Sequence, residues 1–233
     1  MQTPRSIAAA VFTAALMLPA LARAAPAEPG PGFEIGARLG YGFSAGRLGA
    51  PPNGTDNDVG NFVSGQWPLW LDAGWRFTSD FYFGGVFQYG FGTVNDDQQN
   101  GCRNANVNCA ASDVRLGVMG RYRLPQIMMA APWVGLGVGY EWGSFSVQQS
   151  ILGNTSTDSS WSGFEFANMQ VGADFRVAQK LAVGPFLSVS LGEFRNTSTA
   201  MTMGGTTNTT DQSLAKQSLH EWIMFGARFA FMP

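Results

Sequence analysis

The feature that most constrains this chain is a repeated two-residue alternation of apolar and polar side chains. In the first run Phe33, Ile35 and Leu39 alternate with Glu34 and Arg38. Successive side chains of a β-strand point to opposite faces, so each run predicts a strand with one apolar, aromatic face and one face of glycine and charge. Eight such runs occupy residues 33–44, 67–77, 81–91, 113–123, 134–142, 167–176, 181–192 and 219–231. The sequence therefore predicts an all-β protein with an even number of strands.

The connections between these runs alternate between short and long. The links at 78–80 and 178–180 are short, and the link at 125–132 is of intermediate length. The other links are long and rich in Asn, Thr, Ser, Asp and Gly: 47–65, 94–112, 149–160 and 195–217. Short turns at one end and long polar loops at the other are typical of an antiparallel transmembrane β-barrel. The alternative, a soluble β-sandwich, would require the aromatic faces to be buried against a second sheet.

The composition agrees with a membrane location. Charged residues make up 13% of the chain, about half the usual share in a soluble domain, and aromatic residues also reach 13%. The lysines are Lys180 and Lys216 alone, whereas an ordinary water-exposed surface uses lysine freely. So few basic residues exclude a nucleic-acid-binding protein, and no nucleic-acid partner is expected.

The N-terminus has the pattern of a secretory signal peptide. Arg5 precedes an apolar stretch at 7–18, and Ala22-Arg23-Ala24 matches a cleavage site. An N-terminal membrane anchor is the alternative, but the apolar stretch is shorter than the roughly 20 residues that a spanning helix needs. We therefore expect a signal peptide at 1–24, a short segment at 25–32 and one β-barrel domain at 33–233.

Charged residues occur at the positions that would face the interior of the barrel. A register with Arg123 opposite Trp133 places Arg115 opposite Glu141, and a register for the first two strands places Arg38 opposite Asp72 and Glu34 opposite Arg76. Arg228 would approach Glu34 across the closing seam. The expected lumen charge network comprises Glu34, Arg38, Asp72, Arg76, Arg115, Glu141, Asp174, Arg176 and Arg228. Such pairs predict a structural plug; the alternative is a selectivity or gating element in a narrow pore.

Few residues are suited to bind metals or to form disulfides. Cys102 and Cys109 lie close together in a polar stretch, which predicts a local disulfide in an oxidising compartment. His220 is the one histidine of the sequence. No metal site and no cofactor are expected.

The signal peptide, the eight alternating runs, the loop lengths and the aromatic final run (Trp222, Phe225, Phe229, Phe231) together resemble small outer-membrane β-barrel proteins of the OmpA/OmpX and porin-like type. The resemblance covers the expected mature chain. It implies a location in the outer membrane of a Gram-negative bacterium, contact with lipid and lipopolysaccharide, and recognition of the last strand by the barrel-assembly machinery. In this chain Phe231 would serve as the aromatic signal, because Met232 and Pro233 follow it. No peptidoglycan-binding domain is expected after the last run, so the resemblance does not imply tethering to the cell wall.

A barrel in a membrane also predicts two aromatic girdles. One is expected at the short-turn end and one toward the long loops. The first comprises Phe33, Phe77, Phe81, Tyr122 and Phe231, and the second comprises Tyr41, Tyr89, Tyr140 and Trp142.

Catalysis is a further possibility, because some outer-membrane barrels are hydrolases. Ser218 and His220 would both face inward near the loop end of the last strand, while Glu221 would point outward. The Ser-x-His order is the reverse of the lipid A deacylase pattern, and no orienting carboxylate is evident in the sequence. We therefore predict a non-enzymatic barrel with a structural or surface-interaction role through its long loops. A narrow channel for small or hydrophobic solutes is the alternative, and a lipid hydrolase is a minor one.

Overall fold

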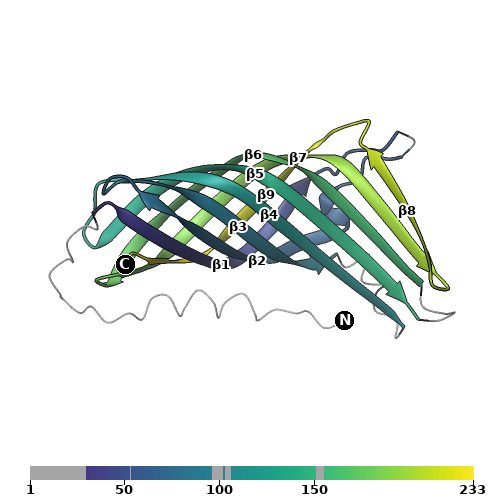
Figure 1. The fold of residues 1–233 in the computed structure, drawn as a ribbon, viewed down its shortest axis with the longest axis horizontal. Coiled ribbons are helices and arrows are strands. Elements are labelled where there is room, and N and C mark those ends of the chain that lie inside the picture. Colours follow the sequence, from purple (N-terminus) through teal and green to yellow (C-terminus); the bar gives the residue numbers. More distant parts are fainter. Residues whose placement is uncertain (1–29, 53, 96–101, 103–105, 151–154) are drawn as a thin grey trace, which may run out of the picture.

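The computed structural model describes residues 30–52, 54–95, 102, 106–150 and 155–233, and these residues form nine β-strands and one 3-10 turn. The expected signal peptide lies outside the described residues. The strands wind around one barrel, and β8 extends from one of its ends (Figure 1). Their bounds are β1 Gly32–Gly46, β2 Val63–Arg76, β3 Phe81–Val94, β4 Val107–Arg123, β5 Ala130–Gln149, β6 Thr155–Ala178, β7 Leu181–Met203, β8 Thr206–Ser213 and β9 Leu219–Phe231, with the turn η2 at Val59–Asn61.

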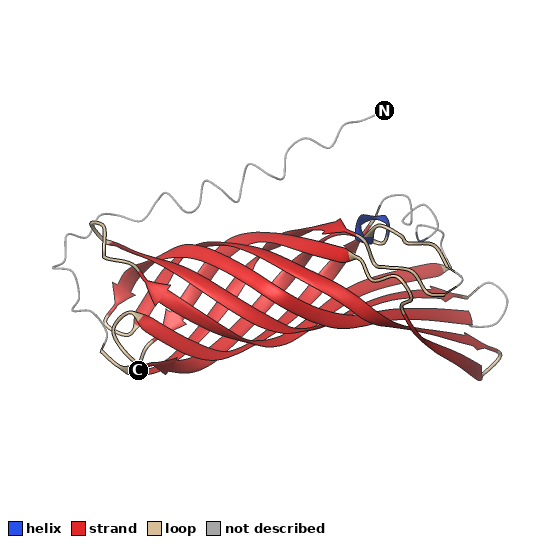
Figure 2. Cartoon of the chain, turned by 90° about the horizontal axis from the view of Figure 1, so that it is seen from above, coloured by secondary structure: helices blue, strands red, loops and turns tan. Residues whose placement is uncertain are grey.

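Eight of these strands close into a ring. Neighbouring strands pair in an antiparallel manner from β1 through β7, β7 pairs with β9, and β9 pairs with β1. The strands are tilted around the barrel axis (Figure 2). Buried side chains fill the interior of the barrel. At the β1–β9 seam Gly40 lies opposite Gly226. A Cβ atom at Gly226 would come within 2.0 Å of the Leu39 carbonyl oxygen, so the close approach of the two backbones requires glycine there.

The apolar faces of the predicted runs point outward. Leu39, Leu71, Leu116 and Leu136 are between 46% and 59% exposed, and they belong to four different strands. A continuous belt of such side chains is unfavourable in water and favourable in hydrocarbon. Closure also pairs both edges of every strand in the ring, as a bilayer demands. The predicted all-β transmembrane barrel with a ring of eight strands is confirmed.

The ninth strand was not predicted. The 195–217 link was expected to be a loop, but β7 continues to Met203 and returns as β8, which pairs with β7 and with no other described strand. Gly204 and Gly205 connect the two strands with φ of 57° and 82°. A two-residue hairpin turn with both central residues at positive φ matches the twist of its strands. The Gly-Gly pair therefore forms a hairpin that extends past the ring, beside the outer part of β6 (Figure 1).

The two ends of the barrel differ. Short turns join β2 to β3, β4 to β5 and β6 to β7 at one end, here called the inner end. At the outer end lie the β7–β8 hairpin and the connection between β1 and β2, called loop 1 (residues 47–62), which contains η2. Loop 1 is anchored to residues 214–219 by backbone hydrogen bonds, including Ala50 N to Lys216 O at 2.8 Å and Arg47 N to Leu219 O at 2.9 Å. These bonds hold loop 1 against the mouth of the barrel.

Candidate functional site

Charged and aromatic side chains fill the lumen. Twelve acidic and arginine side chains face inward, each no more than 8% exposed: Glu34, Arg38, Asp72, Arg76, Asp113, Arg115, Arg121, Arg123, Glu141, Glu165, Asp174 and Arg228. Arg176, also expected in this network, is half-buried near the inner end. The twelve side chains form two clusters, one nearer the short turns and one nearer the long loops.

Glu34 is the centre of the inner cluster. Its carboxylate accepts a hydrogen bond from Arg228 at 2.6 Å and another from Arg121, and Arg76 lies 3.6 Å away. Arg228 donates its other terminal nitrogen to Asp174 at 2.7 Å. The contact of Arg228 with Glu34 across the closing seam is the one expected from the sequence. One carboxylate therefore ties together four strands around the ring.

The register expected between β1 and β2 is wrong by two residues. Arg38 lies opposite Trp70, and Asp72 lies opposite Gly36. A two-residue shift keeps each side chain on the same face, so the ion pair of Arg38 with Asp72 still forms, diagonally, at 2.9 Å. The observed register leaves room for Asp72, because a Cβ atom at Gly36 would lie 2.5 Å from its carboxylate. It also places the Trp70 ring 5.0 Å from the Arg38 guanidinium, a favourable cation–π distance.

Arg115 is the centre of the outer cluster. It lies opposite Glu141 in the register that was predicted for β4 and β5. Its guanidinium is 3.0 Å from Asp113, 3.3 Å from Glu141 and 3.1 Å from Glu165. Three buried carboxylates therefore share one arginine. Glu141 has two further partners, because His220 Nε2 lies 2.9 Å from it and Trp222 Nε1 donates to it at 3.1 Å.

Amide side chains connect the two clusters. Arg38 donates to Gln170 at 2.6 Å, Gln170 donates to Asn168 at 2.7 Å, and Asn168 donates to Glu165 at 2.8 Å. The result is an unbroken chain of hydrogen bonds along the lumen. A connected polar network of this kind stabilises one arrangement of the strands, since displacing one member leaves others buried without partners.

Four charged members of the network were not among the predicted site residues. Asp113, Arg121 and Arg123 stand at inward positions of a run that the sequence already showed, so the same alternation could have found them. Glu165 was hidden because a bulge between Glu165 and Ala167 interrupts the alternation. Before the bulge the even-numbered residues Phe164 and Phe166 face outward, at 48% and 47% exposed, whereas after it the odd-numbered Met169 does.

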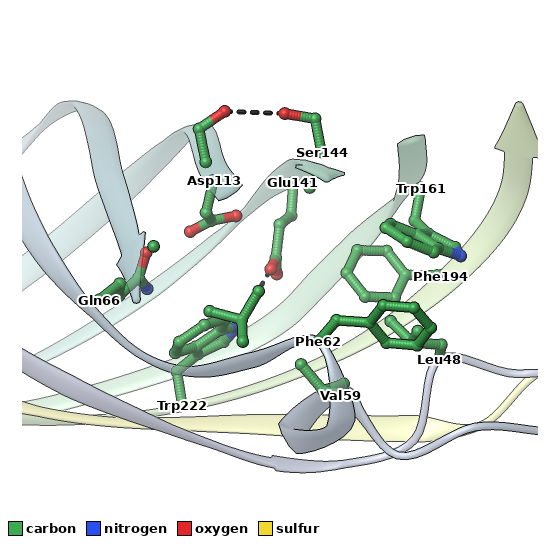
Figure 3. A pocket seen from close by; sticks show the side chains of 14 residues that line it. Leu48, Val59, Phe62, Gln66, Asp113, Glu141, Ser144, Trp161, Phe194 and Trp222 are labelled. Carbon is green, nitrogen blue, oxygen red and sulfur yellow. Dashed lines mark hydrogen bonds between the residues drawn. The ribbon is translucent and has the colours of Figure 1, made fainter. Parts of the chain in front are cut away.

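An apolar lid covers the outer cluster. Leu48 and Val59 of loop 1 and Leu214 of the 214–218 connection pack with Phe194 and Trp222, each no more than 6% exposed. Phe62 and Trp161 pack against this group with ring centroids 5.6 Å apart. Between the lid and the lumen lies a cavity of about 30 Å³, which Gln66, Asp113 and Glu141 line on the lumen side (Figure 3). A volume of that size holds a water molecule but no larger solute.

Asp56 holds loop 1 in place. Its carboxylate accepts hydrogen bonds from Ser218 Oγ at 2.8 Å and from the Gly49 amide at 3.0 Å, and Lys216 Nζ lies 2.9 Å away. The Lys216 ammonium, together with the Ser218 hydroxyl and the Gly49 amide, lowers the pKa of Asp56 from 3.8 to about 2. Burial acts in the opposite direction and is outweighed. The Asp56 carboxylate, which links loop 1 to the 214–218 connection, is therefore ionised at neutral pH.

Ser218 and His220 have different partners. The Ser218 hydroxyl binds Asp56, while the His220 ring binds Glu141 and stacks on Phe194 with centroids 4.0 Å apart. The absence of an orienting carboxylate, inferred from the sequence, is corrected: Glu141 comes from β5, far along the chain, and only folding brings it to His220. His220 and Glu141 both lie under the lid as members of the outer cluster.

The other predicted residues lie as follows. The aromatic residues of both proposed girdles face outward, and in the outer set Tyr140 lies 4.6 Å from Trp142 and Tyr41 lies 5.0 Å from Phe43 by ring centroid. Cys102 and Cys109 form a disulfide. No group of three or more potential metal ligands occurs among the described residues. In the same part of the chain, no helix is long and apolar enough to cross a membrane.

Comparison by sequence finds no matching protein-family model and no matching curated protein. Comparison by structure finds many matches. A major outer-membrane protein from Thermus thermophilus has a TM-score of 0.59 at 11% identity, with 86% of this chain and 99% of that chain covered. The outer-membrane protein AlkL (TM-score 0.49, 13% identity, 91% and 95% covered) and the Neisserial surface protein A (0.44, 10%, 88% and 99%) are also similar.

Identities this low establish the fold alone. The fold of the matched Thermus thermophilus outer-membrane protein agrees with the closed ring, the outward apolar belt and the polar lumen described above. The chain therefore has the fold of a bacterial outer-membrane β-barrel protein.

Proposed function

We propose that this protein is a sealed, non-enzymatic outer-membrane barrel that interacts with its surroundings through its outer end. The observation that carries this proposal is the filled lumen: two ion-paired clusters, joined by hydrogen-bonded amides and covered by an apolar lid. A solute passing through would have to break several buried ion pairs. Breaking one such pair by removing a partner costs about 3–5 kcal/mol.

The outer end offers a surface for interaction. The β7–β8 hairpin extends past the ring, and every residue of β8 is exposed. This hairpin is rich in Thr, Ser and Asn and is nearly free of charge, with Asp211 its one acidic residue. An extracellular ligand, lipopolysaccharide included, is the partner we propose for this end. The aromatic girdles would hold the barrel at the two membrane interfaces, and the last strand, through Phe231, would be recognised by the assembly machinery.

One observation favours a second candidate, a narrow path that prefers anions. The inner cluster contains Arg38, Arg76, Arg121, Arg123 and Arg228 against the three carboxylates Glu34, Asp72 and Asp174. An excess of arginine attracts anions into a pore. The same excess is compatible with a plug, because these guanidinium groups also stack on buried rings, Arg121 on Tyr82 at 4.6 Å and Arg228 on Trp133 at 5.6 Å.

Planar-bilayer recording separates the two candidates. The refolded wild-type barrel should give no stepwise conductance in a salt gradient. Reproducible steps with an anion-selective reversal potential would overturn the sealed lumen, and loss of that selectivity in Arg121→Gln would assign it to the inner cluster. Protein that shifts in mobility on heating in a mild detergent gel provides the folding control.

The outer end is tested by shortening the hairpin. Asn196 and Ser213 already lie opposite each other, so Thr197 to Gln212 can be replaced by an Asn-Gly turn. This removes the outermost β6–β7 pairs and keeps those from Ser162–Asn196 inward. Cells displaying this variant should adhere less to lipopolysaccharide-coated surfaces than cells displaying the wild type, at equal amounts of folded barrel. Equal adhesion would contradict a surface role for the hairpin.

A further inference from the structure

A second hollow lies at the outer end, on the solvent side of the lid. It is a groove of about 440 Å³ between loop 1 and the parts of β6, β7 and β8 beyond the ring. Leu48, Phe62 and Trp161 line both this groove and the cavity beneath the lid, so the lid is one layer of side chains thick. Figure 3 shows Trp161 and Phe62 side by side in that layer. The groove is therefore separate from the lumen and open to the exterior.

We propose that this groove binds a neutral saccharide. The inference rests on the proposed surface role and names the chemical class of its ligand. The groove combines an apolar base with polar sides. Its base is formed by Leu48, Phe62, Trp161 and Leu214, and its polar groups are Thr55, Asn57, Thr197, Thr199, Thr210 and Gln212. A sugar ring has the matching chemistry, because its C–H face packs on an aromatic ring while its hydroxyls exchange hydrogen bonds with hydroxyl and amide side chains.

The strand register arranges the polar groups on one face. Thr197 lies opposite Gln212 and Thr199 lies opposite Thr210. These four side chains are two apart on each strand, so they share the face that lines the groove, while Thr209 and Asp211 point to the other face. Neighbours along a strand are then about 7 Å apart and partners across strands about 5 Å apart. This is the scale of a single pyranose ring.

The groove also selects against other ligands. Among the described residues, no Asp, Glu, Lys or Arg lines it, so an acidic or basic ligand would find no counter-charge. The nearby Asp56 carboxylate is already engaged by Lys216 and Ser218. Thr197 already donates to the Ser160 carbonyl and Asn57 to the Thr55 carbonyl. A purely apolar solute would displace water from the remaining threonine and amide groups without replacing its hydrogen bonds, which is unfavourable. The volume lies near the lower end of the usual range for ligand pockets and accommodates about one or two sugar rings.

Saturation-transfer NMR and calorimetry on the full refolded chain, in micelles free of lipopolysaccharide, test this inference. The probes are glucose, galactose, N-acetylglucosamine and lactose, with a sulfated disaccharide, octanol and a neutral tetrapeptide for comparison. At least one neutral sugar should bind, and Thr210→Val should weaken it about three- to tenfold, the effect expected for loss of one hydrogen bond.

Thr209→Val is the matched control, since it makes the same change on the opposite face of the same strand and should leave binding unchanged. Failure of every neutral sugar to bind, stronger binding of a comparison probe, or equal effects of the two valine variants would overturn the inference. The proposed function can fail independently: a conducting wild-type barrel that binds sugar through Thr210 refutes the sealed lumen only, whereas a silent, adhesive barrel without sugar binding refutes the groove only.

Discussion

Replacing Arg115 by alanine should destabilise the barrel far more than the loss of a surface ion pair. Arg115 is 3% exposed and contacts three buried carboxylates at 3.0 to 3.3 Å. Without it Asp113, Glu141 and Glu165 would retain only neutral hydrogen-bond donors and the His220 ring. Removing one partner of a buried ion pair lowers the free energy of unfolding by about 3–5 kcal/mol, and we expect Arg115→Ala to fall in that range.

The double variant Arg115→Ala with Glu141→Ala should recover part of this loss. One of the three stranded carboxylates is then gone, so recovery of about a third, roughly 1–2 kcal/mol, follows if the three contribute equally. Full recovery is not expected, because Asp113 and Glu165 remain buried and because Trp222 loses its acceptor. The two substitutions together should therefore lower the free energy of unfolding by less than the sum of their separate effects.

Urea unfolding in phospholipid vesicles, followed by tryptophan fluorescence in both directions, gives the four free energies of this cycle. Asp58→Ala supplies the matched control, since Asp58 lies 3.4 Å from Arg47 with both side chains more than half exposed. Exposed pairs contribute about 0–1 kcal/mol. Additive effects at Arg115 and Glu141, within about 0.5 kcal/mol, would refute a buried pair in this register.

Other predictions concern the whole barrel and its outer end. Unheated protein should migrate faster than boiled protein on a mild detergent gel, because a closed ring of hydrogen-bonded strands resists unfolding; identical mobility of folded and boiled samples would contradict closure. Reduction of the Cys102–Cys109 disulfide should leave this mobility shift intact, since the bond links Cys109 near the outer end of β4 to a residue seven positions earlier and joins no two strands of the ring; a membrane-impermeant maleimide should label intact cells only after reduction. The pKa of Asp56 is lowered from 3.8 to about 2, so its tie to Lys216 and Ser218 should be complete above pH 4 and be lost as the pH falls through about 2. The protection factors of the Gly49 and Lys216 amides, which correct for the intrinsic pH dependence of exchange, should fall over that interval in the wild type, and Asp56→Asn should show low protection at every pH. Finally, the wild type should show no ester or lipid A hydrolysis; activity abolished by His220→Ala would establish a catalytic role for the outer cluster.

The sequence by itself determined the strands and their faces. The alternation of Phe33, Ile35 and Leu39 with Glu34 and Arg38 identifies both the strand and the side that meets lipid, because a β-strand has a period of two whatever its neighbours. The loop lengths then determine antiparallel neighbours and the two ends of the barrel. For β4 and β5 the sequence also predicted the register, with Arg115 opposite Glu141.

Only the tertiary structure decided how the side chains inside the ring combine. The sequence placed Asp72 opposite Arg38, but the space left by Gly36 and the ring of Trp70 favour a register two residues away. Alternation does not distinguish registers that differ by two, because both keep the same face inward. Packing volume inside a closed ring makes that choice.

The lid and the groove belong wholly to the tertiary structure. Leu48, Trp161 and Leu214 lie far apart in the chain, and in the sequence each stands in a polar stretch without a pattern. His220 lies in a predicted run, but its partner Glu141 is 79 residues away, and only the fold brings the two together. A periodic pattern reports which way a residue points within its own strand, whereas contacts between loops depend on ring closure, which brings all eight strand ends together.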